Sequence, residues 1–428
     1  MTKTKKKLGL TTVILLALLL GAITGIVLHY TVASTTFVST YITEGLFYVI
    51  GQGFIRLMQM LVVPLVFCSI STGAAAIGDT KTLGKVGIKT LIFYLFTTMI
   101  AVALAISVAF IIKPGLGLDM SKITVSETTA TSSSTSVVDT ILNIIPTNPV
   151  EALSEGNMLA IIFFALLVGL ILAKLGEKVQ TVTNFLIQFN DIMMEMTMIV
   201  MKVAPLGVFA LIARTFTSLG IDAMIPMLKY IAAVIIALML HCFGVYQILL
   251  KVLGRLSPIK FIKKFFPVQM FAFSTATSNA TIPLNIDTLE EKMGVDRHLS
   301  SFTIPLGATI NMDGTSIMQG VAVVFVAQAF GINLSVVDYL TVIVTATLAS
   351  VGTAGIPSVG LVTLAMVFNS VGLPVEGIGL IMGIDRILDM IRTAVNVTGD
   401  AVCTTIIARQ NGSIDLDVYN TDVATESN

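Results

Sequence analysis

The stretch DRILDMIRTAVNVTGD (residues 385–400) decides the fold, because it places five ionisable side chains in an otherwise strongly apolar chain. Its polar positions are Asp385, Asp389, Arg392, Asn396 and Asp400. At about 100° per residue these positions fall within roughly 80° of one another, so they form one stripe along a helix. The other faces of that helix carry Ile, Leu, Met and Val.

The composition around this stretch is that of a membrane protein. The chain has 428 residues, of which 55% are hydrophobic and 12% charged, and its mean hydropathy is +0.94. Long apolar runs occur at 8–28, 60–67, 91–112, 158–173 and 230–250. Several of these runs are long enough to span a bilayer, so the sequence predicts an all-α, multi-pass membrane protein. The net charge of zero predicts no nucleic-acid partner.

A charged side chain at the centre of a bilayer costs about 2.5–3.5 kcal/mol, so the stripe is expected to face protein or a polar cavity. One interpretation is a structural network in which Asp385 and Asp389 neutralise Arg392. The other is a site for a polar substrate and ions. The second is favoured because another segment of the same half of the chain offers Asn311 and Asp313.

The second half of the chain contains an internal repeat. FAFSTATSNATIPL (271–284) and ASVGTAGIPSVGLV (349–362) place Ser, Thr, Gly and Pro in apolar surroundings, and each precedes a helix with a polar cluster, at 311–315 and 396–400. Both helices are predicted to break at these clusters. Irregular backbone at membrane depth is tolerated only beside protein or a wet cavity, and paired interruptions indicate a transporter site near the bilayer midplane.

Positive charges orient the chain. Lys and Arg gather near the N-terminus, at 81–89, at 174–178 and at 251–264. The positive-inside rule places these segments in the cytoplasm, and with an even number of spans both termini are expected there. The Ser/Thr-rich segment at about 114–140 is predicted to be an external loop.

Spacing assigns roles within the stripe. Arg392 has a planar fork suited to a carboxylate, and Asp389, about 4.5 Å away along the axis, suits an ammonium group. Together they fit an amino acid with a second carboxylate, whose α-carboxylate could bind backbone N–H groups near Ser278. Asp313 and Asp400 supply hard oxygen ligands of the kind that Na⁺ takes.

These residues resemble the glutamate transporter family, the dicarboxylate/amino acid:cation symporters. The resemblance covers nearly the whole chain and includes MLVVPLVF (60–67), APLGVFALIA (204–213), SFTIPLGATINMDGT (301–315), VGTAGIP (351–357) and NVTGD (396–400). It implies eight transmembrane helices plus two re-entrant helical hairpins, inverted repeats and a homotrimer. It also implies an elevator mechanism, in which a transport domain moves past a fixed scaffold.

The resemblance divides the chain as follows. Residues 1–86 and 114–220 form the scaffold and an external loop, residues 87–113 and 221–411 form the transport domain, and residues 412–428 form a cytoplasmic tail. The first hairpin is expected at about 258–294. The second, at about 336–371, is expected to be the external gate.

The same resemblance implies the site residues. Substrate contacts are expected from Ser278, Thr315, Ile356, Gly360, Asp389, Arg392, Thr393 and Asn396. One sodium site would use Gly307, Asn311, Asn396 and Asp400. A second would use Thr309, Met312, Ser350, Val351 and Thr353. A third would use Tyr94, Thr97, Thr98, Asn311 and Asp313.

Some positions depart from the family pattern. Members tend to carry a second arginine at places that here hold Ala276 or Met390, although Arg386 lies one turn before Met390. Vertebrate members carry a glutamate, associated with proton and potassium coupling, where this chain has Gln319. The expected protein is therefore a sodium-coupled importer of L-aspartate or L-glutamate without potassium counter-transport, with no cofactor except Na⁺ as coupling ion. Proton coupling stays open.

Several alternatives are weighed against this interpretation. A C4-dicarboxylate carrier would not need Asp389, and a neutral amino acid carrier would not need Arg392. An anion channel would have a polar lining along several spans. The three histidines are scattered and no nucleophile with a base is present, so an enzyme is not predicted; His241 is interpreted as a satisfied buried histidine. A nucleotide-driven pump is disfavoured because no phosphate-binding loop motif occurs.

Overall fold

The computed structural model describes residues 10–31, 35, 37–78, 84–118, 142, 145–351 and 359–421. Within these residues the chain is helical, and apart from one isolated bridge between Val295 and Ile414 it forms no β-structure. Most of the expected external loop lies outside the described residues, as do Thr353 and Ile356.

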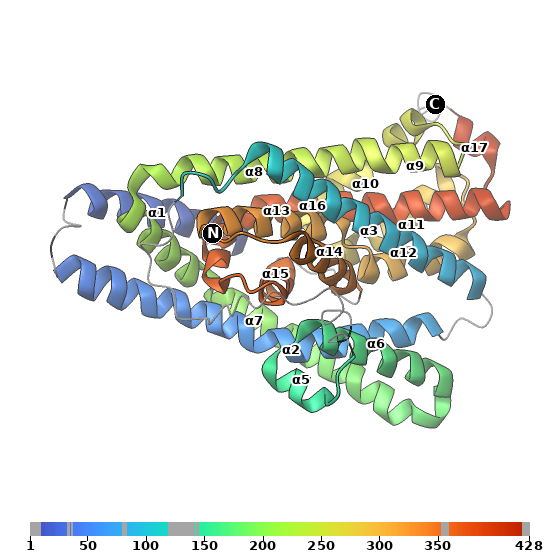
Figure 1. Ribbon diagram of the computed structural model, residues 1–428. Helices are drawn as coiled ribbons and strands as arrows, with labels where there is room; N and C mark the ends of the chain where they lie inside the picture. The colour runs from blue at the N-terminus through green and yellow to red at the C-terminus, as the bar shows by residue number, and fades with distance from the viewer. Residues whose placement is uncertain are drawn as a thin grey trace, which may run out of the picture.

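One group of helices comes from the N-terminal half. It comprises α1 (Leu10–Thr31), η1 (Val38–Phe47), α2 (Tyr48–Gly78), α5 (Pro149–Glu155), α6 (Met158–Leu175), η3 (Gly176–Val179) and α7 (Gln180–Leu219). α1 and α2 pack on α7, and α6 packs on α2. Figure 1 shows α2, α6 and α7 along the lower side of the molecule.

The second group contains α3 (Gly84–Ile112) and nearly all helices of the C-terminal half. The latter are α8 (Met224–Leu240), η5 (His241–Val245), α9 (Tyr246–Leu253), α10 (Pro258–Thr275), α11 (Ser278–Glu291), α12 (Arg297–Ile310), α13 (Asp313–Ala329), α14 (Val336–Ser350), α15 (Val359–Ser370), η6 (Val375–Gly377), α16 (Ile378–Asn411) and α17 (Leu416–Asn420). η4 (Gly220–Ala223) joins α7 to α8. α3 packs on α13, α14 and α8, while α16 packs on α10, α12 and α13 (Figure 1).

Six helical stretches of the described residues are long and apolar enough to cross a membrane. They are Thr12–Thr31, Val38–Ala75, Val86–Ile112, Ala160–Ser218, Met224–Leu253 and Arg297–Ala329. The 59-residue stretch Ala160–Ser218 joins α6, η3 and α7. α16 is not among the six stretches, and it carries the charged stripe. The prediction of an all-helical chain is confirmed for the described residues, and their long apolar helices are consistent with a multi-pass membrane protein.

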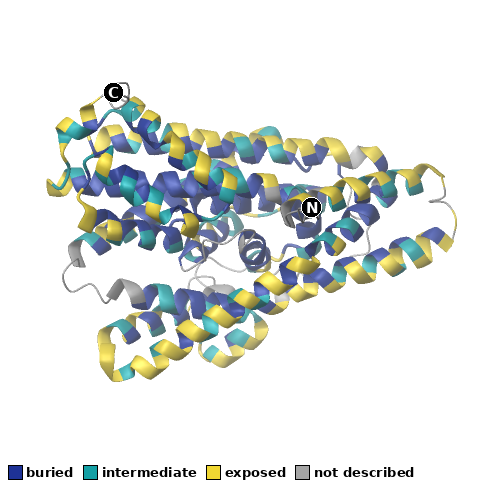
Figure 2. Cartoon of the chain, turned by 180° about the vertical axis from the view of Figure 1, so that it is seen from behind, coloured by how far each residue is buried: buried dark blue, intermediate teal, exposed yellow. Residues whose placement is uncertain are grey.

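The helices differ in what surrounds them. In Arg297–Ala329, which covers α12 and α13, the apolar window is 100% buried within the protein, whereas in Thr12–Thr31 only 24% of it is. Figure 2 shows buried residues inside the bundle and exposed residues on its outer faces. Many of the exposed residues are large and apolar, for example Leu20 of α1 and Ile225 of α8. A surface of this kind suits contact with lipid or with another protein.

The segment after α16 is packed against the protein, although a tail was expected there. The Asp415 N–H donates to the Gly294 carbonyl (2.7 Å), and the Asp296 N–H donates to the Ser413 carbonyl (3.0 Å). Tyr419 is fully buried, and its hydroxyl donates to the Ser257 carbonyl at 3.0 Å. Burial raises the pKa of Tyr419 above its usual value. Residues 412–421 therefore belong to the folded body.

Lys264 connects three parts of this end of the molecule, because its buried ammonium donates to the carbonyls of Lys292 and Val418, each at 2.7 Å. Lys264→Met is expected to lower the free energy of unfolding by about 1–3 kcal/mol, since two partly buried carbonyls lose a charged donor. A thermal unfolding curve in detergent measures the effect. Lys263→Met, at an exposed neighbouring position, is the control. Equal melting temperatures for the two variants would contradict the role of Lys264.

Candidate functional site

The stripe on α16 is buried along its whole length. Asp385, Asp389, Arg392, Asn396 and Asp400 are each 7% exposed or less. α16 runs without interruption from Ile378 to Asn411, so the predicted break at 396–400 is wrong. The predicted break in the other helix is present, because α12 ends at Ile310 and α13 begins at Asp313.

Arg392 lies between two carboxylates of its own helix. Its Nη1 donates to Asp385 Oδ1 at 2.6 Å, and its Nη2 donates to Asp389 Oδ1 at 3.0 Å. Arg392 Nε is buried and has no hydrogen-bond partner among the described residues. A buried guanidinium is stable only when paired, so the two aspartates hold the fork in place. Asp389 and Arg392, predicted to bind opposite ends of a substrate, are bonded to each other here.

Asp313 accepts hydrogen bonds from three other helical segments. Its Oδ1 accepts from Thr98 of α3 at 2.5 Å, and its Oδ2 accepts from Tyr246 of α9 at 2.8 Å. His241 Nε2 of η5 lies 3.0 Å from the same Oδ2. The carboxylate is fully buried. The interpretation of His241 as satisfied holds for Nε2 but not for Nδ1, which is buried and has no hydrogen-bond partner in the part of the chain that the structure describes.

The broken helix meets α16 at Asn311. Asn311 Nδ2 donates to Asp400 Oδ1 at 2.8 Å and to the Asn396 carbonyl at 3.0 Å. Asn396 in turn accepts from the Gly314 N–H at 2.7 Å and donates to Met312 Sδ at 3.3 Å. The cluster therefore joins both sides of the α12–α13 break to α16.

Glycine allows this close approach at two positions. A side chain at Gly307 would collide with the Asp400 carboxylate and the Tyr94 hydroxyl. A side chain at Gly399 would collide with the Tyr246 hydroxyl and Asn311 Nδ2. These glycines leave room for polar groups at the junction of the helices.

The other predicted residues lie at different distances from the stripe. An added Cβ at Gly360 would be 2.8 Å from Thr315 Cγ2 and 3.8 Å from Arg392 Nη2, so these three residues lie together. The Thr393 hydroxyl donates to the Asp389 carbonyl at 2.8 Å. Tyr94, Thr97 and Thr98 lie on α3, where both threonine hydroxyls donate to the Tyr94 carbonyl.

Four further predicted residues are placed by their helices. Ser278 is the first residue of α11 and is buried. Ser350 ends α14, where its hydroxyl donates to the Thr347 carbonyl, and Val351 follows it. The Thr309 hydroxyl donates to the Leu306 carbonyl near the end of α12. None of these bonds links the four residues to Arg392.

The oxygen donors suit a small hard cation. Asn311 Oδ1 is buried without a hydrogen-bond partner among the described residues, and it belongs to the side chain that contacts Asp400. Buried polar atoms are nearly always hydrogen-bonded in folded proteins, so an unpartnered buried oxygen is consistent with a bound water or ion. The described residues contain no cluster of three or more His, Cys, Asp or Glu side chains able to hold a metal. A cation at this place would therefore depend on carbonyl, amide and hydroxyl oxygens beside a carboxylate.

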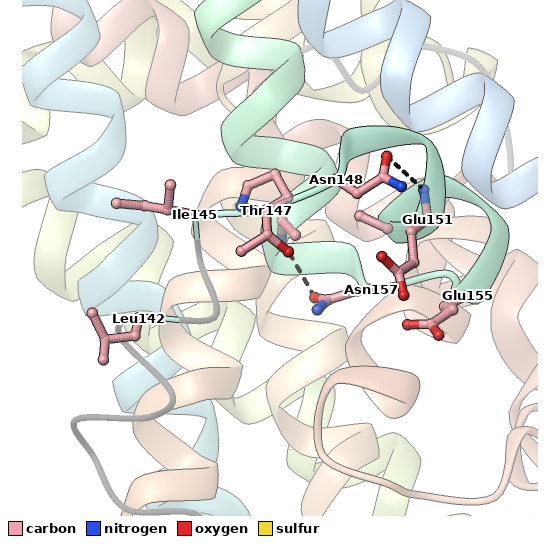
Figure 3. Close-up of a pocket in the computed structure, with 10 residues that line it drawn as sticks. Leu142, Ile145, Thr147, Asn148, Glu151, Glu155 and Asn157 are labelled. Carbon is pink, nitrogen blue, oxygen red and sulfur yellow. Dashed lines mark hydrogen bonds between the residues drawn. The ribbon is translucent and has the colours of Figure 1, made fainter.

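A cavity of about 550 Å³ lies beside α5, and no residue of the stripe lines it (Figure 3). Asn148 caps α5 by accepting from the N–H of Val150 and Glu151. Glu151 and Glu155 supply the charge of the cavity wall. A wall with two carboxylates repels an acidic ligand, so this cavity does not suit one.

A model of the sodium:dicarboxylate symporter family matches residues 10–410. The chain belongs to the sodium:dicarboxylate symporter family. This confirms the resemblance predicted from the sequence, and the buried stripe lies within the matched residues.

Several curated members of the sodium:dicarboxylate symporter family are similar over most of their length. The proton/sodium-glutamate symport protein of Bacillus caldotenax is 37% identical over 95% of this chain and 96% of its own. The proton/glutamate-aspartate symporter of Escherichia coli (strain K12) is 37% identical over 96% of this chain and 94% of its own. Excitatory amino acid transporter 3 of Mus musculus is 32% identical over 88% of this chain and 81% of its own.

Three residues of the cluster were not among the predicted site residues. Asp385 makes the shorter of the two bonds to Arg392, and the stripe itself was the signal for it. His241 and Tyr246 bind Asp313 from 72 and 67 positions away in the sequence. No local pattern could indicate those two contacts.

Proposed function

We propose that this protein is a sodium-coupled secondary active symporter that imports acidic amino acids, L-aspartate or L-glutamate, across the cytoplasmic membrane. The observation that carries the proposal is the buried Arg392, which sits 3.0 Å from Asp389. One group suits a carboxylate and the other an ammonium. The names of the curated relatives support the same substrate class.

Substrate binding would then exchange partners within the stripe. The side-chain carboxylate of the substrate takes the place of Asp389 on Arg392 Nη2, while Asp385 keeps its 2.6 Å bond to Nη1. Asp389, released from the arginine, accepts the amino group of the substrate. Further contacts are proposed for Ser278, Thr315, Ile356, Gly360, Thr393 and Asn396.

Sodium ions would bind at three places beside this exchange. The first is formed by Gly307, Asn311, Asn396 and Asp400, and the unpartnered Asn311 Oδ1 supports it. The second is formed by Thr309, Met312, Ser350, Val351 and Thr353. The third is formed by Tyr94, Thr97, Thr98, Asn311 and Asp313, and the bond from Thr98 to Asp313 supports it.

Transport would follow an elevator mechanism in a homotrimer with eight transmembrane helices, two re-entrant hairpins and cytoplasmic termini. The scaffold comprises α1, α2, α6 and α7, and the moving unit comprises α3 and the helices from α8 to α16. α10 with α11, and α14 with α15, form the hairpins, which is supported by the packing within each pair. The second hairpin is the external gate, which closes when ions and substrate are both bound.

The first test is uptake of labelled L-aspartate by the purified chain in proteoliposomes. An inward sodium gradient is expected to drive uptake, whereas an inward proton gradient without sodium is expected to drive little. Uptake driven by a proton gradient alone would support the proposed substrate but contradict the proposed sodium sites. If neither gradient drives uptake of L-aspartate or L-glutamate, the proposed substrate class is wrong.

Asp389→Asn distinguishes an amino acid carrier from a dicarboxylate carrier. L-Aspartate affinity is expected to fall about 10- to 100-fold, because a neutral amide replaces the charged acceptor of the amino group. Competition by succinate, which has no amine, is expected to weaken less than competition by L-aspartate. Asp287→Asn, at a half-exposed carboxylate beside Arg297, is the control. Equal losses for both competitors would contradict the role of Asp389.

A further inference from the structure

A small polar cavity lies where η6 and the start of α16 meet α2 and α7. It has a volume of about 20 Å³. Gln52, Arg214 and Thr215 line it from α2 and α7, and Glu376 and Leu380 line it from η6 and α16. Its walls therefore come from both the scaffold and the moving unit of the proposed elevator.

The scaffold holds Arg214 in place. Arg214 Nη2 donates to Glu44 Oε2 at 2.7 Å, and Nε donates to Glu44 Oε1 at 3.3 Å. The guanidinium carbon also lies 4.7 Å from the centre of the Tyr48 ring. The arginine side chain is only 5% exposed. A guanidinium held by two bonds to a carboxylate and by an aromatic ring is rigid, so Arg214 is a fixed part of the cavity wall.

Two buried atoms at this cavity have no hydrogen-bond partner among the described residues. They are Gln52 Nε2, a donor on the scaffold, and Glu376 Oε2, an acceptor on the moving unit. A cavity of about 10–15 Å³ or more can hold one water molecule, provided that polar groups bind it. A water here would accept from Gln52 Nε2 and donate to Glu376 Oε2, and Arg214 lines the same cavity.

The apolar packing beside the cavity depends on the register of the two units. The Leu211 side chain of α7 occupies the space that a side chain at Gly51 or at Gly379 would need. A shift of one helical turn, about 5.4 Å, would remove Gly379 from Leu211 and separate Glu376 from Gln52. The polar contact and the close packing therefore occur together, in one position of the moving unit.

We propose that Gln52, Arg214 and Glu376, bridged by one water molecule, form a polar docking point that holds the moving unit against the scaffold in this position. The docking point rests on the proposed elevator mechanism. It contacts neither the substrate nor the ions, so its residues position the moving unit and leave the binding site unchanged.

A disulfide reporter measures how often this position is occupied. Leu211 Cγ, the atom that a cysteine sulfur would replace, lies 3.4 Å from the place of a Cβ at Gly379. Leu211→Cys with Gly379→Cys, in a chain whose three native cysteines are replaced, should therefore cross-link under mild oxidation. Cross-linking is expected to stop L-aspartate uptake, and reduction is expected to restore it.

In this reporter chain, Glu376→Gln and Gln52→Leu are each expected to slow cross-linking at least about fivefold. L-Aspartate affinity in detergent should stay within about twofold, which also shows that the variants are folded. The double variant should be no slower than either single variant, because both remove the same water bridge. Glu290→Gln, at a carboxylate bonded to Arg297 on the surface, is the matched control.

The outcomes separate the docking point from the elevator. Unchanged cross-linking rates in both variants would overturn the docking point. A reporter that never cross-links would overturn it as well, because the position itself would be absent. A fully cross-linked chain that still transports L-aspartate would instead overturn the elevator mechanism.

Discussion

Arg392→Ala is expected to reduce sodium-driven uptake of L-aspartate at least about 100-fold. Removing one partner of a buried, hydrogen-bonded charge pair costs about 2–5 kcal/mol, and each 1.4 kcal/mol is a factor of ten in affinity. The loss is large because the substrate carboxylate loses the guanidinium group that would bind it. In addition, Asp385 and Asp389, bonded to the arginine at 2.6 and 3.0 Å, lose that counter-charge.

The control and a conservative variant separate recognition from folding. Arg392→Lys keeps the charge but removes the fork, so its uptake should lie between that of wild type and that of Arg392→Ala. Arg297→Ala removes a side chain that is 60% exposed, and its uptake should stay within about twofold of wild type. If Arg392→Ala bound L-aspartate as tightly as wild type in detergent, the substrate carboxylate would have to bind elsewhere.

The burial of Arg392 can be predicted from the sequence because it depends only on the spacing of residues within one helix. Four-, three- and four-residue spacings place the polar groups on one face of a helix, and the cost of charge in lipid turns that face inward. The break between α12 and α13 is also local, since Asn311 lies in it and Gly314 follows in the first turn of α13. Helix-breaking residues within a polar cluster were enough to indicate it.

The predicted break in α16 is wrong because its asparagine and glycine serve contacts with other helices and do not interrupt the helix. Asn396 and Gly399 were expected to break the helix, but the Asn396 side chain bonds to Gly314 and Met312 on the other helix. Gly399 stays helical and makes room for Tyr246. A glycine in the sequence is compatible with either a bend or a close contact between helices, and the packing of the fold determines which of the two occurs.

The distant partners of Asp313 mark where sequence reasoning stops. His241 and Tyr246 reach it from η5 and α9, two short segments that follow α8 without a break. Their side chains look like ordinary members of an apolar run. Their role becomes visible only when the fold brings η5 and α9 to the start of α13.

Asp400→Asn is the second variant for which we expect a large effect. It removes a charge from the proposed sodium site but keeps the shape of the side chain and an oxygen able to accept the 2.8 Å bond from Asn311. A carboxylate is a stronger ligand for a hard cation than an amide oxygen. The sodium concentration for half-maximal uptake is therefore expected to rise at least about tenfold.

The design of this test depends on separating ion binding from substrate binding. At saturating sodium the L-aspartate affinity of Asp400→Asn should approach that of wild type, because Arg392 and Asp389 are unchanged. Asp296→Asn, at a carboxylate that caps α12 by accepting from the His298 and Leu299 N–H groups, serves as the matched control. An unchanged sodium dependence in Asp400→Asn would assign the junction of Asn311 and Asp400 to structure alone, since its geometry would then hold the helices together without binding an ion.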